Sequence, residues 1–142
     1  MGFLDWLLRS APANVVRNQL NGGTTYGGYG WSNAELTMLS LNRNAVAGSE
    51  DGNVIFIEDV KDTDGRMYRI EYQTNPAGNH ATAWCRHSPW PRTSQFSVHA
   101  CHLFETGQIC IGGNSSDLRT VVLRARYWCA AYSYLREHGT WP

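Results

Sequence analysis

Alternating apolar and polar positions predict β-strands in the middle of the chain. Between residues 66 and 74, Tyr68, Ile70 and Tyr72 share one face, and mostly polar side chains occupy the other. Counting this run, four segments have strand-like alternation or are rich in apolar and β-branched residues: Ala34–Leu41, Gly52–Val60, Arg66–Thr74 and His80–His87. Short turn sequences separate them, which predicts an antiparallel meander because parallel strands need long crossover connections.

Helices are predicted at both ends of the chain. Phe3–Leu20 carries apolar positions at helical spacing and is expected to form two helical pieces. A longer helix is expected between a cap at Ser116 or Asp117 and a stop at Gly139. The residues of this helix that we expect to pack against the rest of the domain are Leu118, Val121, Val122, Ala125, Trp128, Cys129, Tyr132 and Tyr134. The sequence therefore predicts one α+β domain over residues 1–142, with an N-terminal helix, a four-stranded antiparallel meander, an irregular segment over residues 88–114 and a C-terminal helix.

Charge and hydropathy exclude two classes of partner. Twelve basic and twelve acidic side chains cancel, which argues against a protein that grips nucleic acid through a basic surface. No stretch approaches the roughly 20 apolar residues of a membrane span, and residues 1–8, which contain Asp5, are too short for a signal peptide. We therefore expect a cytoplasmic protein that binds neither nucleic acid nor membrane and keeps its thiols reduced.

Cysteine and histidine are concentrated between residues 85 and 110, and the first interpretation is a nucleophilic thiol at Cys110. Glycines flank this cysteine at Gly107, Gly112 and Gly113, and glycine lets the backbone of another chain approach closely. A thiolate is a strong nucleophile. His99 and His102 lie upstream in the sequence and could polarise a carbonyl. The competing interpretation is that Cys110 is an inert thiol in the core.

The second interpretation is a zinc site. Cys85 and His87, and likewise His99 and Cys101, have the spacing that places two side chains on one face of a strand. Four such ligands can hold a tetrahedral zinc ion. Their spacing differs from that of zinc fingers and ribbons, so we expect no metal or other cofactor, and a small zinc-binding protein stays open as an alternative.

Two features near the end of the chain point to a known family. The first is the segment Gly107-x-Ile109-Cys110-Ile111, and the second is the aromatic-rich helix that follows it and ends in Gly139-Thr140-Trp141-Pro142. Residues 97–142 resemble the catalytic half of ubiquitin-conjugating enzymes, in which a His-Pro-Asn tripeptide precedes a Gly-x-Ile-Cys-Leu segment with the catalytic cysteine. The ending is similar to divergent bacterial members from antiviral operons, including operons built around a cyclic-dinucleotide synthase related to cGAS. The resemblance implies the ubiquitin-conjugating fold and a thioester on Cys110.

The tripeptide itself is not reproduced. The sequence His99-Ala100-Cys101 lies near the position of the family's His-Pro-Asn tripeptide. The resemblance therefore assigns the role of the tripeptide histidine to His99 or His102. Cys101 is a second candidate for the cysteine that accepts the cargo. Gly112 and Gly113 would leave room for the incoming tail.

By resemblance, the enzyme takes the C-terminus of a ubiquitin-like protein or of a cGAS-like nucleotidyltransferase and passes it to a lysine amine in antiphage defence. The cargo comes either from a separate activating enzyme or by a route of the chain's own. The alternative is an inactive adaptor with the same fold. Lys61 is the only lysine beside eleven arginines. Because arginine stays protonated and does not attack a thioester, Lys61 and the N-terminal amine are the only acceptors for self-modification. A solvated surface lysine with no such role is the alternative interpretation of Lys61.

Overall fold

The computed structural model describes residues 32–112 and 116–142. The helical pieces predicted over residues 3–20 and the candidate Gly113 lie outside the described residues. Within the described part, no helix is both long and apolar enough to cross a membrane.

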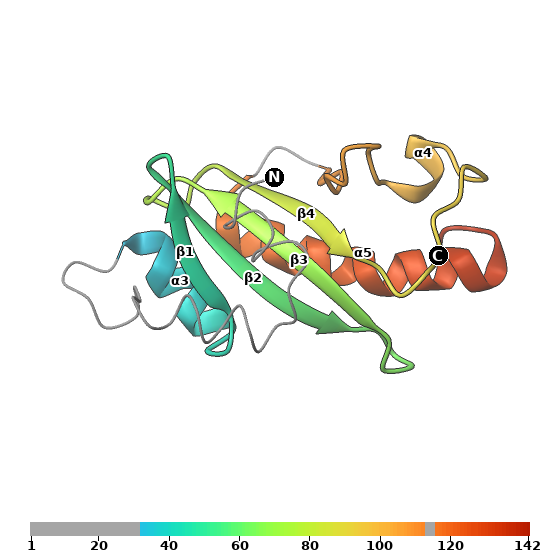
Figure 1. Cartoon of the computed structure of the whole chain (residues 1–142), viewed down its shortest axis with the longest axis horizontal. Helices are drawn as coiled ribbons and strands as arrows, with labels where there is room; N and C mark the ends of the chain where they lie inside the picture. The colour runs from blue at the N-terminus through green and yellow to red at the C-terminus, as the bar shows by residue number, and fades with distance from the viewer. Residues whose placement is uncertain (1–31, 113–115) are drawn as a thin grey trace.

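A four-stranded antiparallel sheet in sequence order forms the centre of the fold (Figure 1). Its strands are β1 (Val46–Glu50), β2 (Asn53–Lys61), β3 (Met67–Thr74) and β4 (Ala81–His87). In the register, Tyr72 of β3 lies between Phe56 of β2 and Ala83 of β4. The meander and its last three strands are confirmed.

The predicted first strand, Ala34–Leu41, is wrong. Asn33–Leu41 forms helix α3, which begins at a capping box. The Glu35 amide donates to Ser32 Oγ at 3.1 Å, and the Ser32 amide donates to Glu35 Oε1 at 3.2 Å. A Ser-x-x-Glu cap followed by good helix formers outweighs the apolar run that suggested a strand. The true first strand, β1, contains small and polar residues and carries little apolar signal.

One face of the sheet packs against helix α5 (Leu118–His138), as predicted (Figure 1). Tyr68, Ile70 and Tyr72 are fully buried on this face, and the Tyr68 ring meets Trp128 of α5 edge-on at 5.8 Å. Asp117 caps the helix by accepting the Thr120 amide at 3.1 Å. Gly139 ends it with a φ of 83°, a left-handed conformation that glycine adopts without strain. The described fold is therefore α+β.

Candidate functional site

A short hairpin carries Cys110 and brings it beside His102. The segment predicted to be irregular contains a one-turn helix, α4 (Val98–Cys101), followed by two short antiparallel stretches. The Phe104 amide donates to the Gln108 carbonyl, and the Cys110 amide donates to the His102 carbonyl, each at 2.9 Å. Cys110 and His102 are therefore cross-strand neighbours, although eight positions separate them in the sequence.

Backbone hydrogen bonds fix this hairpin to the edge of the sheet. The Cys85 amide of β4 donates to the Gly107 carbonyl, and the Ile109 amide donates to the Ala83 carbonyl, both at 2.8 Å. Gly107 turns the chain with a φ of 92°, and a Cβ atom there would lie 3.2 Å from the Cys85 carbonyl oxygen. Because the turn requires both a left-handed residue and this close approach, the glycine before the cysteine has a structural role.

Of the two candidate histidines, His102 is the cross-strand neighbour of Cys110. His102 ends α4 in a left-handed conformation (φ 52°), and its ring centroid lies 4.5 Å from that of Trp141. His99 is exposed on α4. The contact with Trp141 holds the His102 ring near the C-terminal end of the chain, so the sequence after α5 contributes to the site.

Burial separates the two candidate thiols. Cys101 is only 8% exposed, and its thiol donates to the Leu103 carbonyl at 3.7 Å. Its own carbonyl accepts the Trp128 indole N–H at 2.9 Å, which fixes α4 to α5. Cys110 is half-buried at the open end of the hairpin. The Cys110 thiol is therefore the more exposed of the two, while Cys101 is mostly buried and lines a neighbouring groove.

The remaining candidates lie in open positions. Gly112 is exposed, and a Cβ atom there would meet no other atom within 4 Å. The chain just beyond Cys110 is therefore not crowded by the described residues. Lys61 is exposed as the last residue of β2, where it pairs with Met67 of β3.

The geometry does not favour the zinc interpretation. His99 and Cys101 lie on a helix, where residues two apart point in roughly opposite directions because each residue turns by about 100°. The strand-face argument therefore fails for this pair. Across residues 32–112 and 116–142, no three His, Cys, Asp or Glu side chains gather as they would around a metal ion.

A groove of about 780 Å³ lies against the first stretch of the hairpin and α4. Its apolar wall includes Phe96, Val98, Leu103, Phe104 and Tyr132. Arg92 and Glu105 supply one charge of each sign. No local pattern predicts this groove, because its walls come from the 92–98 segment, the hairpin and α5.

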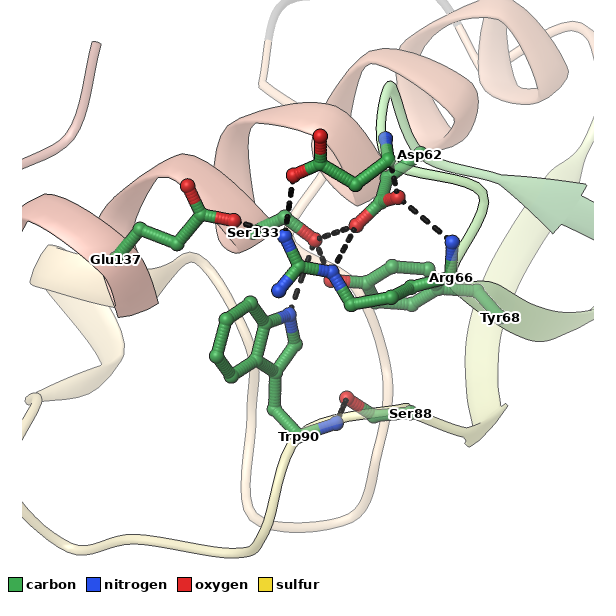
Figure 2. Close-up of polar contacts among 8 residues, drawn as sticks. Asp62, Arg66, Tyr68, Ser88, Trp90, Ser133 and Glu137 are labelled. Carbon is green, nitrogen blue, oxygen red and sulfur yellow. Dashed lines mark hydrogen bonds and ion pairs between the residues drawn. The ribbon is translucent and has the colours of Figure 1, made fainter.

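A buried polar network fixes the segment that leads from β4 to α4 (Figure 2). Ser133 of α5 donates to Asp62 at 2.7 Å and accepts the Trp90 indole N–H at 3.0 Å. The Tyr68 hydroxyl lies 2.6 Å from the same serine oxygen, and the Arg66 guanidinium lies over the Trp90 ring, 4.3 Å from its centroid. The sequence indicated only a turn around Asp62 and missed the network.

Comparison of the chain with protein-family models, with curated proteins and with solved structures gives no match in any of the three.

Alkylation of the native protein is expected to modify Cys110 first. Burial raises the pKa of Cys85 to about 12, and it also raises the pKa of Cys129 well above its ordinary value. These two thiols therefore carry almost no thiolate near neutral pH. Peptide mass spectrometry after a short iodoacetamide pulse at pH 8 measures the order of reaction, with urea-unfolded protein as the control in which all four react. Native labelling of Cys101 as fast as Cys110 would contradict the burial argument.

Proposed function

We propose that the protein is a conjugating enzyme of the ubiquitin-conjugating type, in which Cys110 accepts a protein C-terminus as a thioester and passes it to an amine. The observation that carries the proposal is the half-buried Cys110 at the open end of a sheet-anchored hairpin, next to His102. The order of α3, four-stranded meander, cysteine hairpin and α5 agrees with the order of elements that the resemblance implies.

The proposed chemistry needs two acyl transfers. The Cys110 thiolate attacks the activated carbonyl of the cargo, its sulfur forms the new thioester, and the activating group leaves. An acceptor amine then attacks this thioester, an amide bond forms, the amine loses a proton to solvent, and the thiol is regenerated. In this proposal His102 orients the carbonyl or stabilises the oxyanion, and its place as the cross-strand neighbour of Cys110 supports that role.

The cargo in this proposal is the C-terminus of a ubiquitin-like protein or of a cGAS-like nucleotidyltransferase, delivered by a separate activating enzyme. Antiphage defence in the bacterial cytoplasm is the setting that the resemblance favours. The position of Gly112 supports this proposal, since the glycine is exposed and even an added Cβ atom there would meet no other atom within 4 Å.

Substitution of the two thiols tests the proposal. With an activating enzyme and a labelled cargo, the wild-type chain should form an adduct that thiol reductants cleave. Cys110→Ser should form an adduct that resists reductant and is cleaved by alkali, because an ester replaces the thioester, and Cys110→Ala should form none. The matched control, Cys101→Ser, should behave as wild type. Full conjugation by Cys110→Ala would refute the proposal, and loss of the adduct in Cys101→Ser alone would move the acceptor to Cys101.

A further inference from the structure

Helix α5 exposes an apolar stripe on the side away from the sheet. Leu123, Tyr127 and Tyr134 are 46%, 59% and 42% exposed, and Ala130 between them is also exposed. Their spacing of four, three and four residues places them along one line of the helix, as in a coiled-coil seam. Three of the five large apolar side chains exposed in the described part of the chain lie on this stripe. A helix face that meets only water is normally polar.

We infer that this stripe is the contact between two copies of the chain, related by a two-fold axis, with their α5 helices antiparallel. If the axis passes midway between Tyr127 and Ala130, each Tyr127 meets Ala130 of the partner subunit. Each Leu123 then meets Tyr134 of the partner subunit. Every large residue faces a different residue, and the largest exposed side chain faces the smallest, so the surface is complementary to itself.

The charges at the two ends of the stripe select the antiparallel arrangement. Arg119 and Glu137 are 18 residues apart, which is five full turns of helix, so both lie on the same flank of the stripe. In the antiparallel pair, Arg119 of each copy lies opposite Glu137 of the partner subunit. Arg119 has no ion-pair partner among the described residues, and Glu137 already binds Arg66 through Oε1. A parallel two-fold pair would instead bring the opposite flank of the partner helix beside Arg119, and that flank of α5 carries Arg124 and no acidic residue.

This interface is independent of the proposed chemistry, because Cys110 and His102 lie on the hairpin and not on α5. The apolar stripe and its two end charges are complementary to the same surface on a second, antiparallel copy of α5. The arrangement therefore favours a second copy as the occupant.

Molar mass measured by sedimentation equilibrium of the full chain tests the inference. The wild-type chain should show a concentration-dependent dimer, and Tyr127→Glu should weaken the dimer by about 100-fold because it places a charge at the centre of the contact. At a dilution where both chains are monomeric, the melting temperature of Tyr127→Glu should match that of wild type, since this side chain contributes little to the core. A wild-type chain that stays monomeric at all concentrations overturns the inference, as does a dimer that Tyr127→Glu leaves intact.

Two arginine reversals test the antiparallel register. Arg119→Glu should weaken the dimer by about tenfold, because it places two acidic groups together. Its effect on folding should be small, since an acidic residue suits the first turn of a helix. Arg124→Glu is the matched control: this exposed arginine lies on the opposite flank, where the antiparallel pair brings no exposed acidic residue of α5. Equal weakening by the two reversals would overturn the proposed register.

Discussion

Replacing Glu58 with alanine is expected to lower the free energy of unfolding by about 3 kcal/mol, because it leaves the partly buried Arg126 guanidinium and the fully buried Tyr72 hydroxyl without their acceptor. Glu58 is 3% exposed and accepts four hydrogen bonds. Two come from Arg126 of α5, at 2.7 and 3.1 Å, one from Asn42 at 2.8 Å and one from the Tyr72 hydroxyl at 3.0 Å. Burial and the neighbouring Glu58 charge raise the pKa of Tyr72 well above its ordinary value, so Tyr72 remains a neutral donor.

Equilibrium urea unfolding of Glu58→Ala, Glu58→Gln and Glu50→Ala measures this effect. Glu58→Gln keeps the shape of the side chain and should lose less than Glu58→Ala. Glu50 is exposed at the end of β1, so its removal serves as the control and should change stability by less than about 1 kcal/mol. A Glu58→Ala variant as stable as Glu50→Ala would show that the network contributes little.

The elements that the sequence predicted correctly are those with a local pattern. The alternation around Tyr68 and Tyr72 identified β3 and its buried face, and helical spacing from Leu118 to Tyr132 identified α5 together with its cap and its stop. The first strand was misplaced because an apolar run of eight residues suits either element. The capping box at Ser32 decides it in favour of a helix.

The candidate site was predicted in composition but not in geometry. The glycines and the isoleucine neighbours pointed to Cys110, yet nothing local relates that residue to His102 rather than to His99. Their pairing depends on the hairpin, and bonds to Cys85 and Ala83 of β4 hold the hairpin in place. Non-local backbone bonds of this kind have no periodic signature in a sequence, and the same holds for the Glu58–Arg126 pair, which spans 68 residues.

Tyr134 shows where the interpretation of the helix pattern failed. It was expected to pack inside, together with Trp128 and Tyr132, but it is 42% exposed and stacks on the ring of His138 at 4.1 Å. Aromatic character alone does not decide which face of a helix is buried. The exposed position of Tyr134 gives the stripe on α5 its second aromatic residue.

Replacing Asp62 with asparagine is expected to remove about 2 kcal/mol of stability at neutral pH and much less in acid. The Asp62 side chain is only 1% exposed. It accepts the Ser133 hydroxyl at 2.7 Å, two backbone amides (those of Asp64 and Arg66) and the Arg66 side chain (Figure 2). Since the single Ser133 proton goes to Asp62, the serine oxygen is left to accept from Tyr68 and Trp90. Loss of the carboxylate therefore disturbs the support of the whole segment before α4.

The pH dependence follows from the pKa of Asp62. Burial acts to raise this pKa, but the hydrogen bonds from Ser133, from the backbone of Arg66 and Asp64, and from the Arg66 side chain outweigh it, so the pKa lies below its ordinary value of 3.8. A carboxyl group whose pKa is lower in the folded state contributes stability that is fully present above the unfolded pKa. That contribution disappears as the pH falls through the folded pKa.

The difference in unfolding free energy between wild type and Asp62→Asn should therefore be constant from about pH 7 to pH 5 and shrink below about pH 4. Urea unfolding across this range measures it. Asp64→Asn is the control, because Asp64 is 61% exposed and its ion pair with Arg66 is open to solvent; its effect should be small at every pH. A difference for Asp62→Asn that persists unchanged at pH 3 would mean that the neutral carboxyl group supports Trp90 and Tyr68 as well as the carboxylate does. The network would then depend on the shape of the residue rather than on its charge.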